Sequence, residues 1–176
     1  LLLRLFMELF HGKGLPKSSK GFINLWSVWW KKIEENKEEG GYLIELASVL
    51  LQHRQFQISL DVLFDHPVLG ESVKNIQIDS PHQQLLRKGI ISQYFIDNTL
   101  QVSFTMEAAL YYVASLTINT ADITSLPMDN VMWKEVIKFF IWQRASTVNN
   151  EELFSWIDNE AISAELLVKG LAESLI

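Results

Sequence analysis

A tight turn between two extended segments constrains the fold of this chain more than any other feature. Residues 90–96 and 100–104 carry the β-branched and aromatic side chains that favour strands. Asp97-Asn98 lies between them, and a two-residue polar turn of this kind is typical of a β-hairpin. We therefore expect two adjacent strands in a chain whose other apolar segments have helical spacing.

Helices are expected immediately before and after this hairpin. Ser80-Pro81 is an N-cap and first-turn pair that starts a short helix over 82–88, which ends at Gly89. Further helices are predicted from the apolar spacing over 42–52, 58–64 and 107–116, whereas 68–79 is expected to be a turn and loop. Three helices, a two-stranded wing and a closing helix form the topology of a winged helix, a variant of helix-turn-helix.

The flanking segments are also predicted to be helical, so the fold class is mainly α. Apolar periodicity indicates helices over 1–10, 20–37, 128–144, 151–158 and 161–175, with a polar linker over 119–126. Gly40-Gly41 is expected to end the second helix. We expect three parts: a helical subdomain over 1–39, a winged helix over 40–118 and a C-terminal helical subdomain over 119–176. Leu1 and Ile176 both fall within helical patterns, so we expect the chain to be part of a longer protein.

Charge and composition narrow the function classes. The formal net charge is −6, and the 15 Lys and Arg residues are scattered, which disfavours a polyanionic partner. The chain has no Cys, which excludes disulfides, thiol catalysis and Cys-based zinc sites. No segment reaches the roughly 18 to 20 apolar residues of a membrane-spanning helix, and the N-terminal segment lacks the features of a signal peptide. We expect a cytoplasmic location.

No motif indicates a catalytic centre. The segment 12–19 (GKGLPKSS) resembles a phosphate-binding Walker A loop only loosely, because Pro16 stands where the second glycine is required. The four histidines form no HxxxH or HExxH pair, and no Gly-x-Ser-x-Gly nucleophile motif is present. We expect no enzyme activity, no metal and no cofactor in this chain.

DNA binding is an alternative, because winged helices often read DNA. The recognition helix would be 81–88, and its candidate contacts are His82, Gln83, Arg87 and Lys88. Specific binding typically rests on about 6 to 10 phosphate contacts, which this segment can hardly supply. We therefore favour a wing that contacts protein, with a DNA-binding regulator kept as the alternative.

Two segments together resemble a known family. The opening LLLRLFMELFHGKGLP with FINLWSVWWKKIEEN, and the later LLRKGII followed by a hairpin, are similar to NACHT-type signal-transduction ATPases of the STAND class. In that family these segments follow the nucleotide-binding core as a helical segment and a winged helix. The resemblance covers roughly residues 1–116.

The resemblance implies a switch module with specific contacts. The family's phosphate-contacting histidine corresponds to Met106, whose thioether cannot donate a hydrogen bond to phosphate. ATP or ADP is implied for the full-length parent and not for this fragment. The missing core is expected to dock on an exposed apolar face around Leu2, Leu5, Trp29 and Trp30.

The implied function is a relay that couples nucleotide state to oligomerisation or effector output. The implied partners are the protein's own nucleotide-binding domain and other protein domains, with a homo-oligomer as a further option. Nucleic acid and membranes are not expected partners. A helical protein-interaction scaffold, with the C-terminal helices as the start of a repeat, remains the other alternative.

Overall fold

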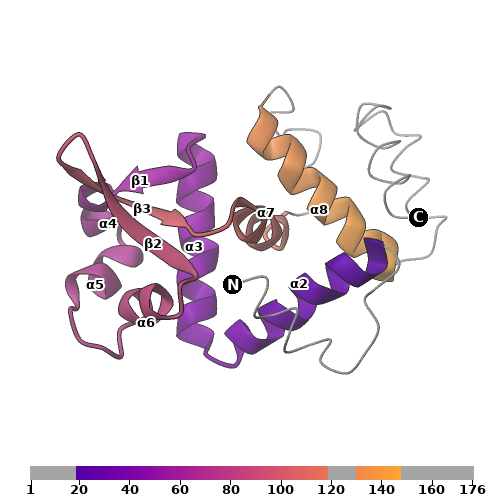
Figure 1. Cartoon of the computed structure of the whole chain (residues 1–176), viewed down its shortest axis with the longest axis horizontal. Helices are drawn as coiled ribbons and strands as arrows, with labels where there is room; N and C mark the ends of the chain where they lie inside the picture. The colour runs from indigo at the N-terminus through magenta and orange to yellow at the C-terminus, as the bar shows by residue number, and fades with distance from the viewer. Residues whose placement is uncertain (1–18, 119–129, 148–176) are drawn as a thin grey trace. The chain divides into compact units, whose positions relative to one another are not determined.

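The computed structural model describes residues 19–118 and 130–147, which fall into two compact units (Figure 1). One unit spans Trp30–Ala114, and the described residues of the other are 19–29, 115–118 and 130–147. The chain is mainly helical, as expected, and carries one small antiparallel sheet. Several expected features lie outside the described residues: the helices over 1–10, 151–158 and 161–175, the 119–126 linker, and Leu2 and Leu5.

Helix α2 (Ser19–Glu34) is followed after two residues by helix α3 (Lys37–His53). The expectation that Gly40-Gly41 ends the earlier helix is wrong, because both glycines lie in the first turns of α3. Asn36 is the N-cap, and its side chain accepts hydrogen bonds from the backbone N–H groups of Glu38 and Glu39. This cap starts α3 firmly enough for the helix to tolerate two adjacent glycines.

The unit that spans Trp30–Ala114 contains the sheet. After α3 come β1 (Gln57–Ser59), α4 (Leu60–Asp65), α5 (Leu69–Lys74), α6 (Pro81–Arg87), β2 (Ile91–Ile96), β3 (Thr99–Phe104) and α7 (Glu107–Ser115). The strand order is β1-β3-β2, and both pairings are antiparallel. A helix, a first strand, a helical region and a hairpin whose second strand pairs with the first strand form the winged-helix topology.

Two local expectations in this unit are corrected. The segment 58–64 was expected to be wholly helical, but Gln57–Ser59 pairs with β3 as a third strand and α4 begins at Leu60. The segment 68–79 was expected to be a turn and loop, but it contains α5. Gly70 permits the close approach of α5 to α4, because a Cβ there would collide with the backbone carbonyl oxygen of Phe64.

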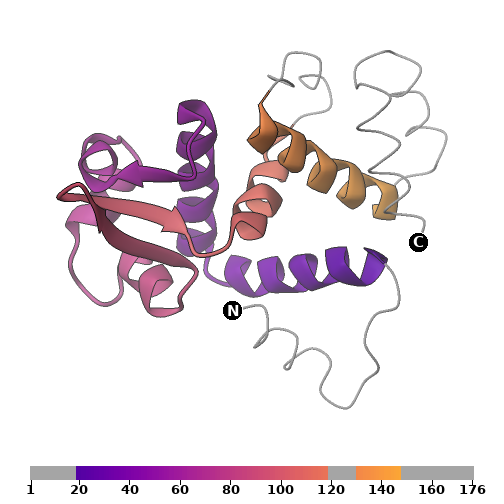
Figure 2. The ribbon, with the colours of Figure 1, turned by 45° about the horizontal axis from the view of Figure 1, so that its top comes forward.

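The core of the winged helix lies between α3 and the sheet (Figures 1 and 2). Helix α3 packs against α5 and α6, and α4 packs against β3. The fully buried apolar side chains come from every layer: Leu43, Leu46 and Leu50 of α3, Leu63 of α4, Leu69 of α5, Leu85 of α6 and Val102 of β3. This mutual burial of apolar surface stabilises helices too short to be stable alone.

The second unit is built around aromatic contacts between α2 and α8 (Val131–Thr147). The ring of Trp26 meets Trp29 edge-on at 5.4 Å and Phe139 at 6.3 Å between centroids. Asn130 caps α8 by accepting from the backbone N–H of Met132. The expected helix over 128–144 is therefore present, with its start shifted to the residue after the Asn130 cap.

Candidate functional site in the winged helix

Helix α6 occupies the position of a recognition helix. Ser80 is its N-cap and accepts from the backbone N–H of Gln83, while Pro81 fills the first turn, as the sequence predicted. The helix ends at Arg87 with Lys88 as its C-cap, and the next residue, Gly89, has a φ of 66°, in the left-handed region that favours glycine. The residues at both ends of α6 therefore explain its short length and the direct passage into β2.

His82 points into the core and not toward solvent. Its side chain is 1% exposed, with Nδ1 lying 2.6 Å from the Tyr42 hydroxyl of α3 and Nε2 lying 2.7 Å from Nε2 of Gln93 in β2. Gln93 Nε2 donates to His82 Nε2, which leaves His82 Nδ1 to donate to the Tyr42 hydroxyl. We call Tyr42, His82 and Gln93 the buried polar triad, which ties α3, α6 and β2 together.

Burial also fixes the charge state of the buried polar triad. Desolvation lowers the pKa of His82 from 6.5 to about 4, so its ring is neutral at pH 7. The same cause raises the pKa of the Tyr42 hydroxyl. A neutral, fully bonded imidazole offers no positive charge to a phosphate.

Lys88 is also held within the unit. Its Nζ lies 2.7 Å from Oε1 and 2.6 Å from Oε2 of Glu39, whose carboxylate is almost fully buried. Glu39 Oε1 accepts a further hydrogen bond from the Asn36 side chain. The ion pair therefore neutralises a buried carboxylate and joins the C-terminal end of α6 to the first turn of α3.

The four predicted DNA-contact residues consequently divide into two groups. His82 and Lys88 are bonded internally, whereas Gln83 is half-buried and Arg87 is exposed. Arg87 alone among the four combines a permanent charge with an exposed position and no bond to a carboxylate in the described part of the chain. A surface of this kind supplies few of the phosphate contacts that DNA binding requires.

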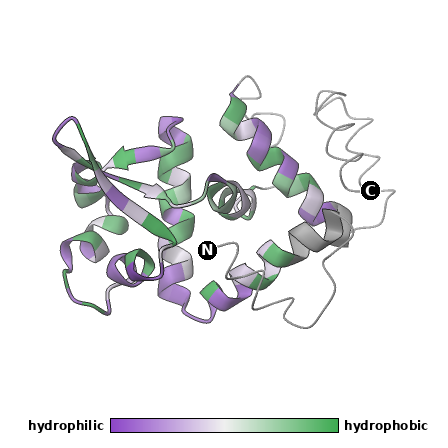
Figure 3. Ribbon diagram, viewed as in Figure 1, coloured by the Kyte–Doolittle hydropathy of each residue, from purple (hydrophilic) through white to green (hydrophobic). Residues whose placement is uncertain are grey.

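The wing shows the opposite character, because it exposes apolar side chains. Phe95 is 74% exposed, and its neighbours Tyr94 and Ile96 are 37% and 36% exposed. Asp97 and Asn98 both have positive φ, which identifies the expected two-residue turn as type I′. The Tyr94 hydroxyl donates to the Gln57 side chain of β1 across the outer sheet face. Figure 3 shows hydrophobic and hydrophilic residues together on this hairpin.

The other predicted site residues do not join this site. Met106 lies half-buried directly before α7, and its backbone carbonyl accepts from the N–H of Ala109. Trp29 and Trp30 are 3% and 5% exposed, so the expectation that they lie on an exposed apolar face is wrong. Both indoles lie on the apolar side of α2, as do the buried side chains of Trp26 and Ile33.

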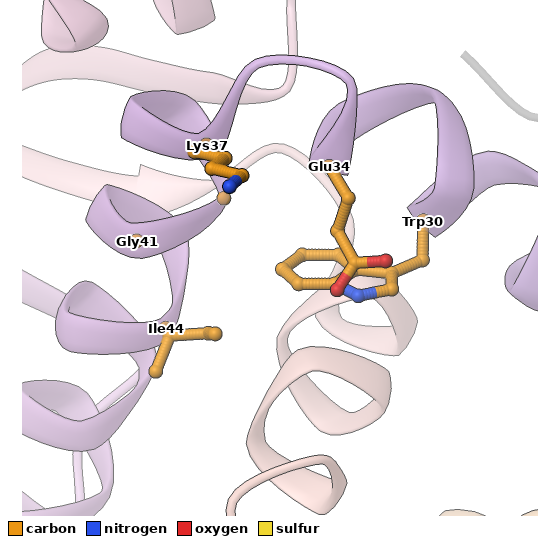
Figure 4. A pocket seen from close by; sticks show the side chains of 6 residues that line it. Trp30, Glu34, Lys37, Gly41 and Ile44 are labelled. Atoms are coloured by element: carbon orange, nitrogen blue, oxygen red, sulfur yellow. The ribbon is translucent and has the colours of Figure 1, made fainter.

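A pocket of about 490 Å³ lies where α2 ends and α3 begins (Figure 4). Trp30 and Glu34 come from α2, and Lys37, Gly41 and Ile44 come from α3. A Cβ at Gly41 would meet nothing within 4 Å, so the missing side chain helps to leave this space open.

Sequence reasoning missed three polar residues of this unit: Tyr42, Glu39 and Gln93. A signal existed for Gln93, because alternation along β2 places it on the same sheet face as Ile91, which is buried. A polar residue at an inward-facing strand position requires a hydrogen-bond partner. That partner, His82, could not be identified without the fold.

Comparisons with known proteins do not assign the chain to a family. No family model matches it, and no curated protein or solved structure is similar enough to count as a match. Within 19–118 and 130–147, no helix has the length and apolar character needed to cross a membrane. The same described segments contain no group of three or more His, Asp or Glu side chains placed to hold a metal ion.

Proposed function

We propose that this chain is a non-catalytic relay fragment of a STAND-type ATPase. Its winged helix would pass the nucleotide state of a neighbouring core to oligomerisation or effector output through contacts between protein domains. ATP or ADP would bind the parent protein's core, in the cytoplasm. The sequence resemblance over roughly residues 1–116, together with the winged helix that follows α2, supports this proposal.

One observation carries the protein-binding part of this proposal. The winged helix bonds His82 and Lys88, two of the four predicted DNA-contact residues, internally and presents apolar side chains on its wing. Exposed apolar surface favours protein contacts, whereas DNA contacts need exposed cationic groups. This distribution supports the relay role over a DNA-binding regulator.

Met106 argues against one possible mechanism for the relay, a direct hydrogen bond from this residue to the nucleotide. Its side chain has no hydrogen-bond donor, so it would not lock the closed state by donating to a nucleotide phosphate. The switch would then depend on the packing of the winged helix against its neighbour. Two packings that differ by a few kcal/mol are sufficient for such a switch.

The coding sequence before Leu1 tests this proposal most directly. We expect a Walker A loop and an acidic Walker B strand within about 100 to 200 residues upstream. An upstream sequence that lacks both would overturn the assignment. ATP turnover by the purified chain would contradict the non-catalytic role, and a colorimetric phosphate assay measures it.

A further inference from the structure

Two adjacent glycines lie in the first turns of α3, and the fold requires neither of them. Neither has a positive φ, so an L side chain could adopt the same backbone conformation. A Cβ at Gly40 would make ordinary contacts of 3.9 Å with Trp30 and Glu34, and a Cβ at Gly41 would meet nothing within 4 Å. Glycine stabilises a helix less than alanine does. Packing and backbone geometry therefore do not account for this pair of glycines.

Both glycines line the pocket where α2 ends and α3 begins. All six lining residues belong to the unit that spans Trp30–Ala114. The pocket volume of about 490 Å³ lies within the range of about 300 to 1,000 Å³ that is usual for small-molecule sites. A larger side chain at Gly41 would fill part of this space. The glycines therefore keep open a pocket of the size that binds a small ligand.

The pocket carries one charged side chain of each sign. Glu34 is the last residue of α2, and Lys37 is the first residue of α3 (Figure 4). Both residues are exposed, and neither side chain forms an ion pair or a hydrogen bond with any residue in 19–118 or 130–147. Each charged group can therefore bind the opposite charge of a ligand that enters from solvent.

The other side chains of the pocket are apolar. Ile44 lines it from α3, and Trp30 lines it from α2. Cη2 of Trp30 and Cγ of Glu34 each lie 3.9 Å from the position of a Cβ on Gly40, so the indole adjoins the Glu34 side chain. A carboxylate next to an aromatic ring suits an ammonium group, which both groups attract.

We propose that this pocket binds a free amino acid with an apolar side chain. Glu34 would bind its ammonium group, Lys37 would bind its carboxylate, and the apolar side chain would lie against Trp30 and Ile44. A ligand with a single charge would satisfy only one of the two charged groups of the pocket. This inference goes beyond the proposed relay role and does not depend on it, because it rests on the pocket alone.

Titration of the ¹⁵N-labelled full chain with L-phenylalanine, followed by NMR, tests the proposal. We expect the backbone amide signals of Gly40 and Gly41 to shift and saturate, with a Kd between about 0.05 and 5 mM for a ligand of this size. The signals of Gly70 and Gly89, which do not line the pocket, should stay in place. The absence of a saturating shift at Gly40 and Gly41 up to about 20 mM ligand overturns the proposal.

Two analogues of phenylalanine test whether the pocket selects a zwitterion. Phenethylamine lacks the carboxylate, and phenylpropionate lacks the ammonium group. Each should bind at least about fivefold more weakly than phenylalanine, because one charged group of the pocket is left without a partner. An analogue that binds as tightly as phenylalanine overturns the assignment of the ligand class.

Two substitutions test the site from the side of the protein. Gly41→Leu should abolish binding by filling the pocket and should not lower the urea midpoint, because a Cβ there meets nothing within 4 Å. Glu34→Gln should weaken binding at least about fivefold. Glu35→Gln is the matched control, because Glu35 is exposed and does not line the pocket, and it should bind like the wild type. Wild-type affinity in Gly41→Leu, or equal affinities of Glu34→Gln and Glu35→Gln, overturns the proposal.

Discussion

The recognition helix and the wing of this domain have opposite surface character. Helix α6 directs His82 and Lys88 toward α3 and β2, where they bond to groups of the same domain. The wing instead exposes Phe95. A winged helix that reads DNA needs the reverse, with cationic groups exposed on the helix. The difference shows that the topology alone does not determine what a winged helix contacts.

The buried polar triad gives the largest expected mutational effect. His82→Ala leaves a cavity and removes both hydrogen bonds of a fully buried ring, so we expect a loss of about 3 kcal/mol of unfolding free energy. Urea denaturation measures this loss. Tyr42→Phe should couple to the same substitution in a double-mutant cycle. If the effects of the two substitutions on the unfolding free energy are additive, the hydrogen bond between Tyr42 and His82 contributes nothing to stability.

The same ring predicts a pH dependence of stability. The folded-state pKa of His82 is lowered to about 4 from 6.5, so the unfolded state binds this proton first. Its contribution is fully present above pH 6.5 and is lost as the pH falls toward 4, by about 3 kcal/mol in total. Urea denaturation at a series of pH values measures the slope. His82→Leu should flatten it in this window, and an unchanged slope would assign the effect to other groups.

Alanine substitutions of the two cations at the end of α6, Arg87 and Lys88, should have smaller effects on stability, and these effects should differ from each other. Lys88→Ala leaves the buried carboxylate of Glu39 without its ion pair, and we expect a loss of about 1 to 2 kcal/mol because Lys88 is itself half exposed. Arg87→Ala should change stability by less than about 0.5 kcal/mol, because Arg87 is exposed. Thermal or urea denaturation of both variants measures this difference. Equal losses would contradict the distinction between these neighbouring residues.

The wing should be the least sensitive region for the stability of the monomer. Phe95→Ser removes a mostly exposed ring, so we expect a change of less than about 0.5 kcal/mol in unfolding free energy at low micromolar concentration. Urea denaturation at that concentration measures it. A loss above about 2 kcal/mol would mean that Phe95 belongs to the folded core.

Local signals in the sequence were sufficient for the wing and for the start of α6. Asp97 and Asn98 tolerate positive φ, and Ser80 with Pro81 starts a helix without any distant partner. These features depend on a few adjacent residues, so the sequence alone predicts them. The same signals failed at Gly40-Gly41, where the cap at Asn36 outweighed two glycines.

Features that depend on distant residues were not predictable in the same way. Strand β1 has three residues and exists because it pairs with β3, more than 40 positions later. The orientation of His82 depends on Tyr42, 40 residues earlier in the chain. A helix as short as α6 shows too little periodicity to indicate which side is buried. The candidate site therefore had to be found from the fold.

A titration of the ¹⁵N-labelled full chain with duplex DNA at low salt, followed by NMR, tests the central claim most directly. We predict no change in the backbone amide signals of Gln83, Arg87 and Lys88 when DNA is added. Shifts of these α6 signals that grow with DNA and disappear as salt is raised would contradict the claim that this winged helix contacts protein and not DNA.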